Sequence, residues 1–345
     1  MRLILRKHKT TTMIEDIQTV STISEEKLAE TALRIAALQN EIEKVVVGQK
    51  RMVNRLLIGL FANGHILLEG VPGLAKTLTI STLARALDLN FKRIQFTPDL
   101  LPADLIGTLI YNQKESNFEV KKGPIFANLI LADEINRSPA KVQSALLEAM
   151  QEKQVTIGEE SYPLQQPFLV LATQNPLEQE GTYPLPEAQV DRFMMRVFVE
   201  YPTKVEEKEI MRRMARTSAK QEVHRIFSID EIFAIRKLVD QVHLSEKIED
   251  YIVEIVMASR KPGDFGLKNI EPYIDFGASP RATIALNLGS RCHALMSGRA
   301  YVLPEDVKEI AKDVLNHRII LNYEAEAEEI TTNYCIEEIL KKVEI

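Results

Sequence analysis

The sequence predicts an α/β fold with a parallel sheet and hairpin inserts, followed by an all-α domain. A short apolar run at Ile66–Leu68, a glycine-containing loop and an amphipathic segment from Lys76 give the order strand, loop, helix. A second apolar run, Asn128–Ala132, ends in two carboxylates and is typical of a strand that is buried on both faces. Beyond residue 202 the apolar residues recur at helical spacing.

The composition describes an ordinary globular protein of about two domains. The 345 residues are 45% hydrophobic and 27% charged. Lysine and arginine number 43 and aspartate and glutamate 49, so the net charge is −6, and the pI is near 5.7. This balance gives no global signal for binding nucleic acid or a membrane surface. The two cysteines, Cys292 and Cys335, exclude a disulfide framework and favour a reducing compartment.

The N-terminal segment does not have the pattern expected of a signal peptide. Residues 1–9 are basic, but their apolar core is three residues long, whereas a signal peptide needs roughly 7–15. No apolar run approaches the length of about 20 residues that a transmembrane helix requires. We expect a flexible lead-in over residues 1–23 and a cytoplasmic protein without a membrane segment.

Two helices are expected before the first strand. Ser24 is a predicted N-cap, and periodic apolar residues continue that helix to about Ile42. A second helix is expected over Arg51–Ala62. Val47 and Gly48 lie in the turn between them, where such a segment can line an adenine pocket or can serve only as a connection.

The loop after the first strand has the residue types of a phosphate cradle. Its backbone N–H groups and the positive end of the next helix would surround phosphate oxygens. Lys76 would add charge at the β- and γ-phosphates, and the Thr77 hydroxyl would ligate Mg²⁺. Ala75 departs from the usual glycine before the lysine. The alternative is a chance Lys-Thr at a helix start. The residues expected to bind the nucleotide are Val47, Gly48, Gly70, Val71, Pro72, Gly73, Leu74, Ala75, Lys76, Thr77 and Leu78.

The two carboxylates after the second apolar run are candidate metal and base residues. The carboxyl end of a parallel strand opens where α/β sheets bind ligands. Asp133 would hold Mg²⁺, and Glu134 would polarise the attacking water. If Asp133 and Glu134 are considered without the loop at 70–77, the alternative is that they form an ordinary acidic turn at the end of a strand.

Alternating apolar and polar residues predict further strands and two hairpins. Phe91–Phe96 alternates like a strand, and residues 108–122 and 154–165 each predict a hairpin. A helix is expected over Ser138–Glu152. Phe168–Thr173 predicts a buried strand that delivers Asn175, which would contact water or phosphate or would only form an Asn-Pro turn.

A domain boundary is expected near Tyr201, with domains at 24–201 and 202–345. Arg192 lies on a short helix before the strand Met194–Val199, and the residues alone favour its pairing with Asp191 or Glu187 over contact with phosphate. The helices expected in the second domain are Lys204–Arg216, Ile229–Gln241, Glu246–Arg260, Arg281–Met296 and Glu305–Asn316. No Cys/His spacing suggests zinc.

Six motifs, in this order, resemble MoxR-type AAA+ ATPases. The motifs are Gly-Val-Pro-Gly-Leu-Ala-Lys-Thr (70–77), Leu-Ala-Asp-Glu-Ile-Asn-Arg (131–137), Ala-Thr-Gln-Asn-Pro (172–176), Leu-Pro-Glu-Ala-Gln-Val-Asp-Arg-Phe (185–193), Gly-Ala-Ser-Pro-Arg-Ala (277–282) and His-Arg-Ile-Ile-Leu-Asn-Tyr-Glu-Ala-Glu-Ala (317–327). The match runs from about residue 20 to the end. The family's loop resembles this one at Gly-Leu-Ala-Lys-Thr, so Ala75 fits the pattern.

The resemblance implies an AAA+ P-loop core with a helical lid, assembled as a ring, commonly a hexamer, with ATP between subunits. The loop at 70–77 would be the Walker A motif, and Asp133 and Glu134 the Walker B pair. Asn175 would be the first sensor. The two hairpins would face the pore or the client.

The resemblance implies roles for four arginines in or near the subunit interface. Arg192 would be an arginine finger that reaches a neighbour's nucleotide, which reverses the interpretation from the residues alone. Arg281 would be the second sensor, in cis or in trans. Arg137 and Arg196 remain alternative interface arginines.

The expected function is Mg²⁺-dependent ATP hydrolysis coupled to chaperone-like maturation of partner protein complexes, with partners that often carry von Willebrand factor A domains. One alternative is a nucleotide-gated interaction module with negligible turnover. Another is a DNA-directed AAA+ motor whose hairpin lysines, Lys114, Lys121 and Lys122, line a pore, although the net charge makes nucleic acid unlikely.

Overall fold

The computed structural model describes residues 23–175, 182–215 and 222–345, so the expected N-terminal lead-in lies almost wholly outside the described residues. The chain forms two compact units. The core unit is Ala37–Phe233 with Asp313–Arg318, and the helical unit takes the chain up to Ala36 together with Ala234–Lys312 and Ile319–Ile345. This division falls at different residues from the predicted domains 24–201 and 202–345, whose bounds stay a prediction.

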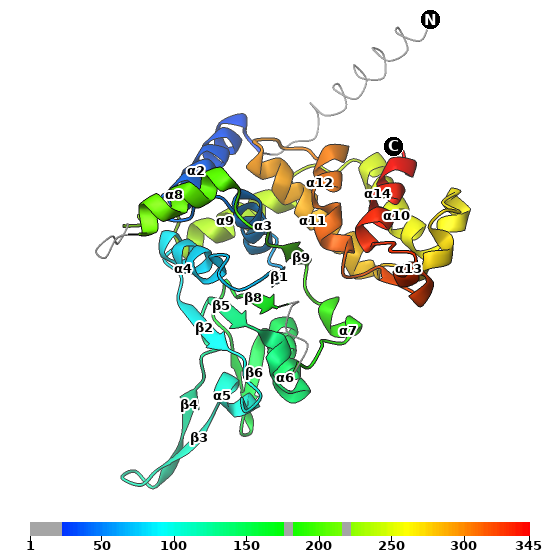
Figure 1. Ribbon diagram of the computed structural model, residues 1–345. Helices are drawn as coiled ribbons and strands as arrows, with labels where there is room; N and C mark the ends of the chain where they lie inside the picture. Colours follow the sequence, from blue (N-terminus) through cyan, green and yellow to red (C-terminus); the bar gives the residue numbers. More distant parts are fainter. Residues whose placement is uncertain (1–22, 176–181, 216–221) are drawn as a thin grey trace, which may run out of the picture. The chain divides into compact units, whose positions relative to one another are not determined.

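The core unit is built on a five-stranded parallel sheet in the order β2-β5-β8-β1-β9 (Figure 1). Its strands are β1 (Ile66–Glu69), β2 (Phe91–Gln95), β5 (Leu129–Asp133), β8 (Leu169–Gln174) and β9 (Met195–Phe198). The three central strands, β5, β8 and β1, are almost entirely buried, as their continuous apolar runs predict. The predicted parallel sheet is therefore confirmed.

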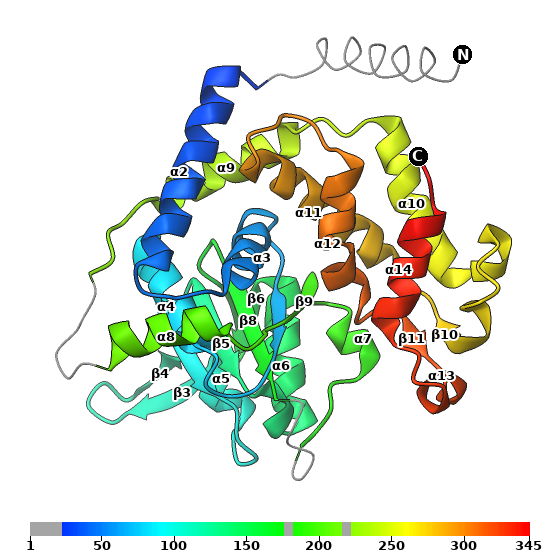
Figure 2. The same cartoon turned by 45° about the horizontal axis from the view of Figure 1, so that its top comes forward.

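Helices cover both faces of this sheet. On one face, α6 (Ala140–Glu152) packs Leu146, Leu147 and Met150 against Ile130 and other side chains of β5 and β8. The opposite face meets α3 (Lys50–Phe61) and α4 (Lys76–Ala86) in Figures 1 and 2. The chain reaches α3 through α2 (Glu25–Glu43). These layers leave the carboxyl ends of the strands open to ligand.

Two antiparallel hairpins interrupt the α/β pattern, as predicted. The first follows α5 (Pro102–Ile106) and consists of β3 (Gly107–Asn112) and β4 (Asn117–Lys122). The second consists of β6 (Gln154–Ile157) and β7 (Glu160–Pro163).

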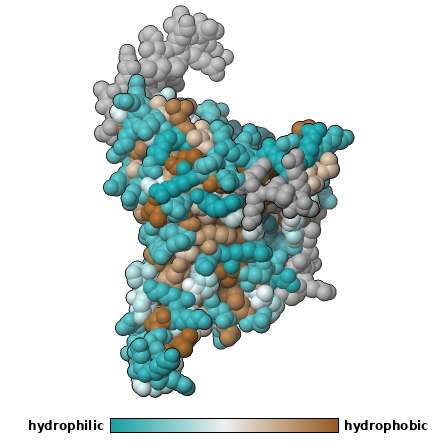
Figure 3. Space-filling view, turned by 90° about the vertical axis from the view of Figure 1, so that its left-hand side faces the viewer, coloured by the Kyte–Doolittle hydropathy of each residue, from teal (hydrophilic) through white to brown (hydrophobic). Residues whose placement is uncertain are grey.

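The first hairpin carries exposed apolar side chains. Tyr111 is paired in register with Phe118, and their rings lie 5.3 Å apart. Leu109, Ile110, Tyr111 and Phe118 are each more than two-fifths exposed. In Figure 3 the lower end, which corresponds to this hairpin in Figure 1, accordingly shows hydrophobic patches among hydrophilic side chains.

The core unit also contains two helices that flank β9 in the sequence and a short segment from the C-terminal part of the chain. α7 (Glu187–Val190) precedes β9, and α8 (Lys204–Met214) follows it, capped by Thr203 and Glu206. The last turn of α12 and the residues up to Arg318 also pack with the core unit.

The helical unit contains most of α9 (Ile229–Gln241) and α12 (Pro304–Leu315), with α10 (Glu246–Arg260), α11 (Pro280–Met296), α13 (Tyr323–Ala327) and α14 (Thr332–Lys342). α10 packs against α11 and α14. Ser279 caps α11 and Pro280 opens it, as predicted. The unit also has a short antiparallel pair, β10 (Ile274–Phe276) with β11 (Ile320–Leu321), that the sequence analysis did not predict. Among the described residues, no helix is long and apolar enough to cross a membrane.

Candidate functional site

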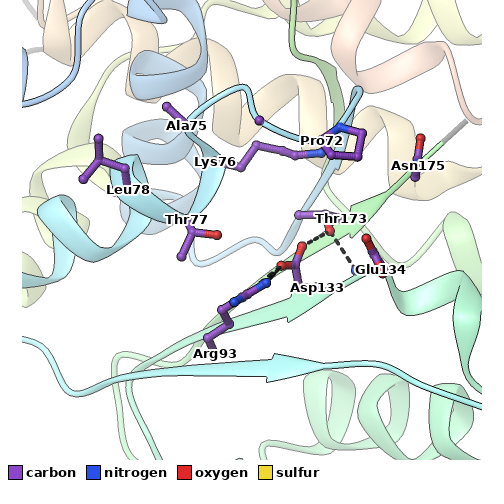
Figure 4. A pocket seen from close by; sticks show the side chains of 11 residues that line it. Pro72, Ala75, Lys76, Thr77, Leu78, Arg93, Asp133, Glu134, Thr173 and Asn175 are labelled. Atoms are coloured by element: carbon purple, nitrogen blue, oxygen red, sulfur yellow. Dashed lines mark hydrogen bonds and ion pairs between the residues drawn. The ribbon is translucent and has the colours of Figure 1, made fainter. Parts of the chain in front are cut away.

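A polar cavity of about 380 Å³ lies at the carboxyl ends of the parallel strands (Figure 4). This is the edge at which open α/β sheets bind ligands, and the volume is in the range of small-molecule sites. The predicted residues Lys76, Thr77, Asp133, Glu134 and Asn175 all line it. The full lining is Pro72, Gly73, Ala75, Lys76, Thr77, Leu78, Arg93, Asp133, Glu134, Thr173 and Asn175.

The loop before α4 has the shape of a phosphate cradle. Gly73 has a φ of +87°, and a Cβ built on it meets nothing within 4 Å, so the backbone faces open space there. Ala75 caps α4 in the left-handed region with a φ of 57°. This conformation is uncommon for alanine and is typical of strained segments at binding sites.

Lys76 folds back onto its own loop. Its Nζ donates a hydrogen bond of 2.6 Å to the Gly70 carbonyl oxygen. Burial lowers the pKa of Lys76, while the charges of Asp133, Glu134 and Glu69 oppose that shift. The ammonium thus lies within electrostatic reach of three carboxylates.

Thr173 on β8 contacts both residues of the acidic pair Asp133–Glu134. Its hydroxyl donates to Asp133 Oδ1 at 2.6 Å and accepts from the Glu134 backbone N–H at 2.8 Å. Glu134 itself has a φ of 57°, in the left-handed region, at the start of a 3₁₀ turn. The hydrogen bond to Thr173 holds Glu134 in this less common backbone conformation at the edge of the cavity.

Two side chains of β2 that the sequence analysis missed complete the network. Arg93 donates through Nε (2.9 Å) and Nη2 (2.6 Å) to Asp133 Oδ2. Gln95 accepts from Arg93 Nη2 at 2.8 Å and donates to Glu134 Oε2 at 2.8 Å. Arg93 and Gln95 share one face of β2 because side chains two residues apart on a strand point the same way. The parallel register Gln95↔Asp133 brings them to the carboxylates, and no local sequence signal predicts this contact.

The donor set fits a hard divalent cation next to a nucleotide phosphate. A threonine hydroxyl and a carboxylate, Thr77 and Asp133, line one cavity, and both supply the oxygen ligands that Mg²⁺ prefers. Lys76 lines the same cavity and adds the positive charge that a polyphosphate requires. In the described part of the chain, no group of three or more His, Cys, Asp and Glu side chains is placed to hold a metal ion by itself. A cation held by Thr77 and Asp133 would take its remaining oxygen ligands from the phosphates and water.

Several predicted residues do not line this cavity. Gly70, Val71 and Leu74 belong to the same loop but lie outside the lining, and so do Val47 and Gly48. Gly48 has a φ of +69°, and a Cβ on it would lie 2.7 Å from Glu206 Oε1, so this turn packs against α8.

Arg192 lies away from the cavity, on a second one of about 260 Å³ that α6 and α7 line. Asp191, its expected ion-pair partner, is bound by Arg318 instead, with Nε to Oδ1 at 2.8 Å. In the part of the chain that the structure describes, no ion pair joins the Arg192 guanidinium to Asp191 or Glu187. The Arg192 side chain is half-buried and lines this second cavity.

The alternative interface arginines are already engaged. Arg137 Nη1 binds Glu134 Oε2 at 3.2 Å, within the cavity's own network. Arg196 binds Glu69 and lies over the Phe198 ring, 5.2 Å from its centroid. Arg281 lies at the start of α11 in the helical unit. The roles of all these arginines stay predictions.

Two family models match the chain. The model of the ATPase family associated with various cellular activities (AAA) matches residues 65–195, and the AAA lid domain model matches residues 267–339. The first covers every residue of the cavity lining and four of the five strands of the sheet, and the second falls mostly, apart from residues 313–318, in the helical unit. The matches agree with the core and lid predicted from the sequence.

Named relatives are similar over most of their length. The chain is 49% identical to Chaperone MoxR1 of Mycobacterium tuberculosis, over 88% of this chain and 80% of that protein. It is 41% identical to YeaC of Bacillus subtilis (88% and 92%) and 31% identical to MoxR of Methylorubrum extorquens (83% and 87%).

A solved structure has the same fold. The crystal structure of a protein from Cytophaga hutchinsonii, provisionally named an ATPase, superimposes with a TM-score of 0.89 at 61% identity, over 93% of this chain and 97% of that one. Sequence motifs, sheet order and relatives thus agree, and this chain belongs to the MoxR family of AAA+ ATPases.

Proposed function

We propose that this protein hydrolyses ATP with Mg²⁺ at the interfaces between its subunits and uses the energy to remodel or mature partner protein complexes. The observation that carries the proposal is the convergence of Lys76, Thr77, Asp133, Glu134 and Asn175 on one cavity. These residues come from three separate segments of the chain.

Each cavity residue has a distinct part in the proposed reaction. The loop N–H groups and Lys76 bind the phosphates, and Thr77 and Asp133 hold Mg²⁺, which when bound neutralises charge on the β- and γ-phosphate oxygens. Glu134 orients the attacking water and accepts its proton. The Asn175 amide hydrogen-bonds the water or the terminal phosphate. Catalysis of this kind relies on positioning and charge stabilisation.

The proposed site needs a second subunit to be complete. The cavity lining contains Arg93 but not Arg192, and Arg192 lies on a separate cavity of the same unit. An arginine finger supplied in trans contributes about 10³–10⁵ in rate in other phosphoryl-transfer enzymes. We therefore place Arg192 in the site of a neighbouring copy, within a ring that we take to be hexameric, and Arg281 as a second sensor.

The client is a protein in this proposal. One relative is named a chaperone. The exposed apolar side chains Leu109, Tyr111 and Phe118 on the first hairpin offer a contact surface for an unfolded or partly assembled client. Clients with von Willebrand factor A domains and a cytoplasmic site of action remain part of the proposal. The two cysteines, which are free and buried, are compatible with that compartment.

Phosphate release tests the hydrolysis step. The wild-type protein is assayed over a range of subunit concentrations with ATP, with either Mg²⁺ or EDTA, and light scattering measures its assembly. We expect metal-dependent release whose rate per subunit rises with concentration as the ring forms. Glu134→Gln should bind ATP and release almost no phosphate. Glu200→Gln, on an exposed glutamate away from the cavity, is the control and should behave as wild type.

Two outcomes would count against this function. ATP binding without phosphate release at concentrations where the protein is assembled would favour a nucleotide-gated interaction module. Wild-type turnover in Glu134→Gln would exclude Glu134 as the base.

A further inference from the structure

Both oxygens of the carboxylate that is expected to hold the metal accept hydrogen bonds from protein donors. Asp133 Oδ1 accepts from the Thr173 hydroxyl at 2.6 Å, and Oδ2 accepts from Arg93 Nε and Nη2 at 2.9 and 2.6 Å. Figure 4 shows Arg93 reaching from β2 to this carboxylate inside the cavity. A divalent cation bound through Asp133 has to compete with the Arg93 guanidinium for the same charge.

Arg93 is not needed to hold β2 in the sheet. The strand pairs with β5 in a regular parallel register from Phe91↔Leu129 to Gln95↔Asp133, and Ile94 is buried in the core. The Arg93 side chain is half exposed, whereas that of Asp133 is 14% exposed. A half-exposed ion pair contributes little to stability, so the guanidinium can leave the carboxylate at low cost and enter water.

The charges around the cavity explain why a counter-cation is needed there. The carboxylates of Asp133, Glu134 and Glu69 all act on Lys76. Glu69 is paired with Arg196 and Glu134 with Arg137, while Asp133 is paired with Arg93. Without Arg93, Asp133 would repel an incoming phosphate until a metal arrived.

We propose that Arg93 is a displaceable counter-cation of the metal site. It neutralises Asp133 when no divalent cation is bound and gives up that carboxylate when the cation binds, so that it weakens metal binding and supports metal-free nucleotide binding. This inference rests on the proposed function, because it takes Asp133 as a metal ligand. It makes Arg93 a positioning residue whose effect appears in binding as well as in turnover.

The test compares nucleotide affinity with and without metal. The dissociation constant of a fluorescent, non-hydrolysable ATP analogue is measured in Mg²⁺ and in EDTA, and the ratio of the EDTA value to the Mg²⁺ value is the metal coupling. In Arg93→Gln we expect weaker binding in EDTA, unchanged or tighter binding in Mg²⁺, and a coupling about two- to fivefold above wild type, the range that follows from the loss of one partly exposed ion pair.

Matched variants separate this effect from a general change of charge. Lys92→Gln removes the same charge from the adjacent position of β2, whose side chain points to the opposite face, and should leave the coupling within twofold of wild type, about the smallest change that the loss of an exposed charge would give. Arg93→Lys keeps the charge but loses the forked hydrogen bonds and should lie between wild type and Arg93→Gln. Asp133→Asn should reduce the coupling towards one.

The outcomes distinguish the two proposals. A wild-type coupling well above one that does not rise in Arg93→Gln would overturn the role of Arg93 and leave the ATPase proposal intact. A rise of equal size in Lys92→Gln would also overturn it, because simple charge removal would then be the cause. A wild-type coupling of one would overturn the metal site and, with it, both proposals.

Discussion

Arg318 binds the carboxylate of Asp191 from 127 residues further along the chain, with Nε to Oδ1 at 2.8 Å. The same guanidinium donates to the backbone carbonyls of Asp191, Phe193 and Met194, at 3.1, 2.7 and 3.0 Å. Only 2% of the Arg318 side chain is exposed. Arg318 thus holds the backbone on both sides of Arg192 while it leaves the Arg192 side chain unpaired with Asp191.

Replacing Arg318 should destabilise the core unit strongly. Arg318→Met removes the guanidinium donors from the partly buried Asp191 carboxylate and from four backbone carbonyl oxygens, and breaking a buried pair costs about 3–5 kcal/mol. Chemical unfolding followed by circular dichroism measures the loss. Arg225→Met is the control, since the Arg225–Asp88 pair is more than half exposed on both sides and should change stability by about 0.5 kcal/mol or less. Equal losses of stability in Arg318→Met and Arg225→Met would contradict this structural role of Arg318.

Gln143 ties the Glu134 loop to the segment after β8. It is fully buried, and its Nε2 lies 3.2, 3.1 and 2.9 Å from the carbonyl oxygens of Ile135, Ser138 and Tyr183. Gln143→Leu removes the donor from these acceptors and should cost about 1–3 kcal/mol of stability.

The same variant should reduce the rate of phosphate release more than ATP affinity, because it loosens the loop that carries Glu134 and leaves Lys76 untouched. Gln154→Leu, at an exposed position of β6, is the control and should affect neither quantity. A weakened ATP affinity with normal turnover would be inconsistent with this role for Gln143.

His317 should make the core unit less stable in mild acid. Burial, together with the neighbouring positive charge of Arg318, lowers the pKa of His317 well below its ordinary value of 6.5. The unfolded chain therefore takes up a proton near pH 6.5 that the folded protein resists, and stability falls as the pH drops below that value, by up to about 1.4 kcal/mol per pH unit.

The pH dependence of unfolding between pH 7 and 5 tests this linkage. We expect wild type to lose stability over that range and His317→Gln, whatever its stability at pH 7, to show a shallower slope. Parallel slopes in the two proteins would assign the acid sensitivity to other groups.

The fold was largely predictable because its signals are local. The buried runs of β5 and β8 and the start of α4 at Lys76 each lie within one short segment, and the parallel sheet that they predict was found. The β10–β11 pair was missed because two or three residues per strand are too few for an alternating pattern.

The sequence predicted only those residues of the candidate site that lie within short local motifs. Lys76, Thr77, Asp133, Glu134 and Asn175 line one cavity, and their roles stay predictions. Arg93, Gln95 and Thr173 were missed because they reach the carboxylates through the order and register of neighbouring strands. The Arg318–Asp191 contact was missed for the same reason, since only the tertiary fold brings these residues together.

The central claim is that one subunit completes the active site of the next, and mixing two defective variants tests it most directly. Arg192→Ala keeps Glu134 but lacks the proposed finger, and Glu134→Gln keeps Arg192 but lacks the proposed base. Each alone should bind ATP and release little phosphate. Mixed rings contain interfaces that join an intact Glu134 to an intact Arg192, so we expect phosphate release well above the sum of the two separate proteins. A mixture that assembles and binds ATP but is no more active than that sum would contradict a site shared between subunits.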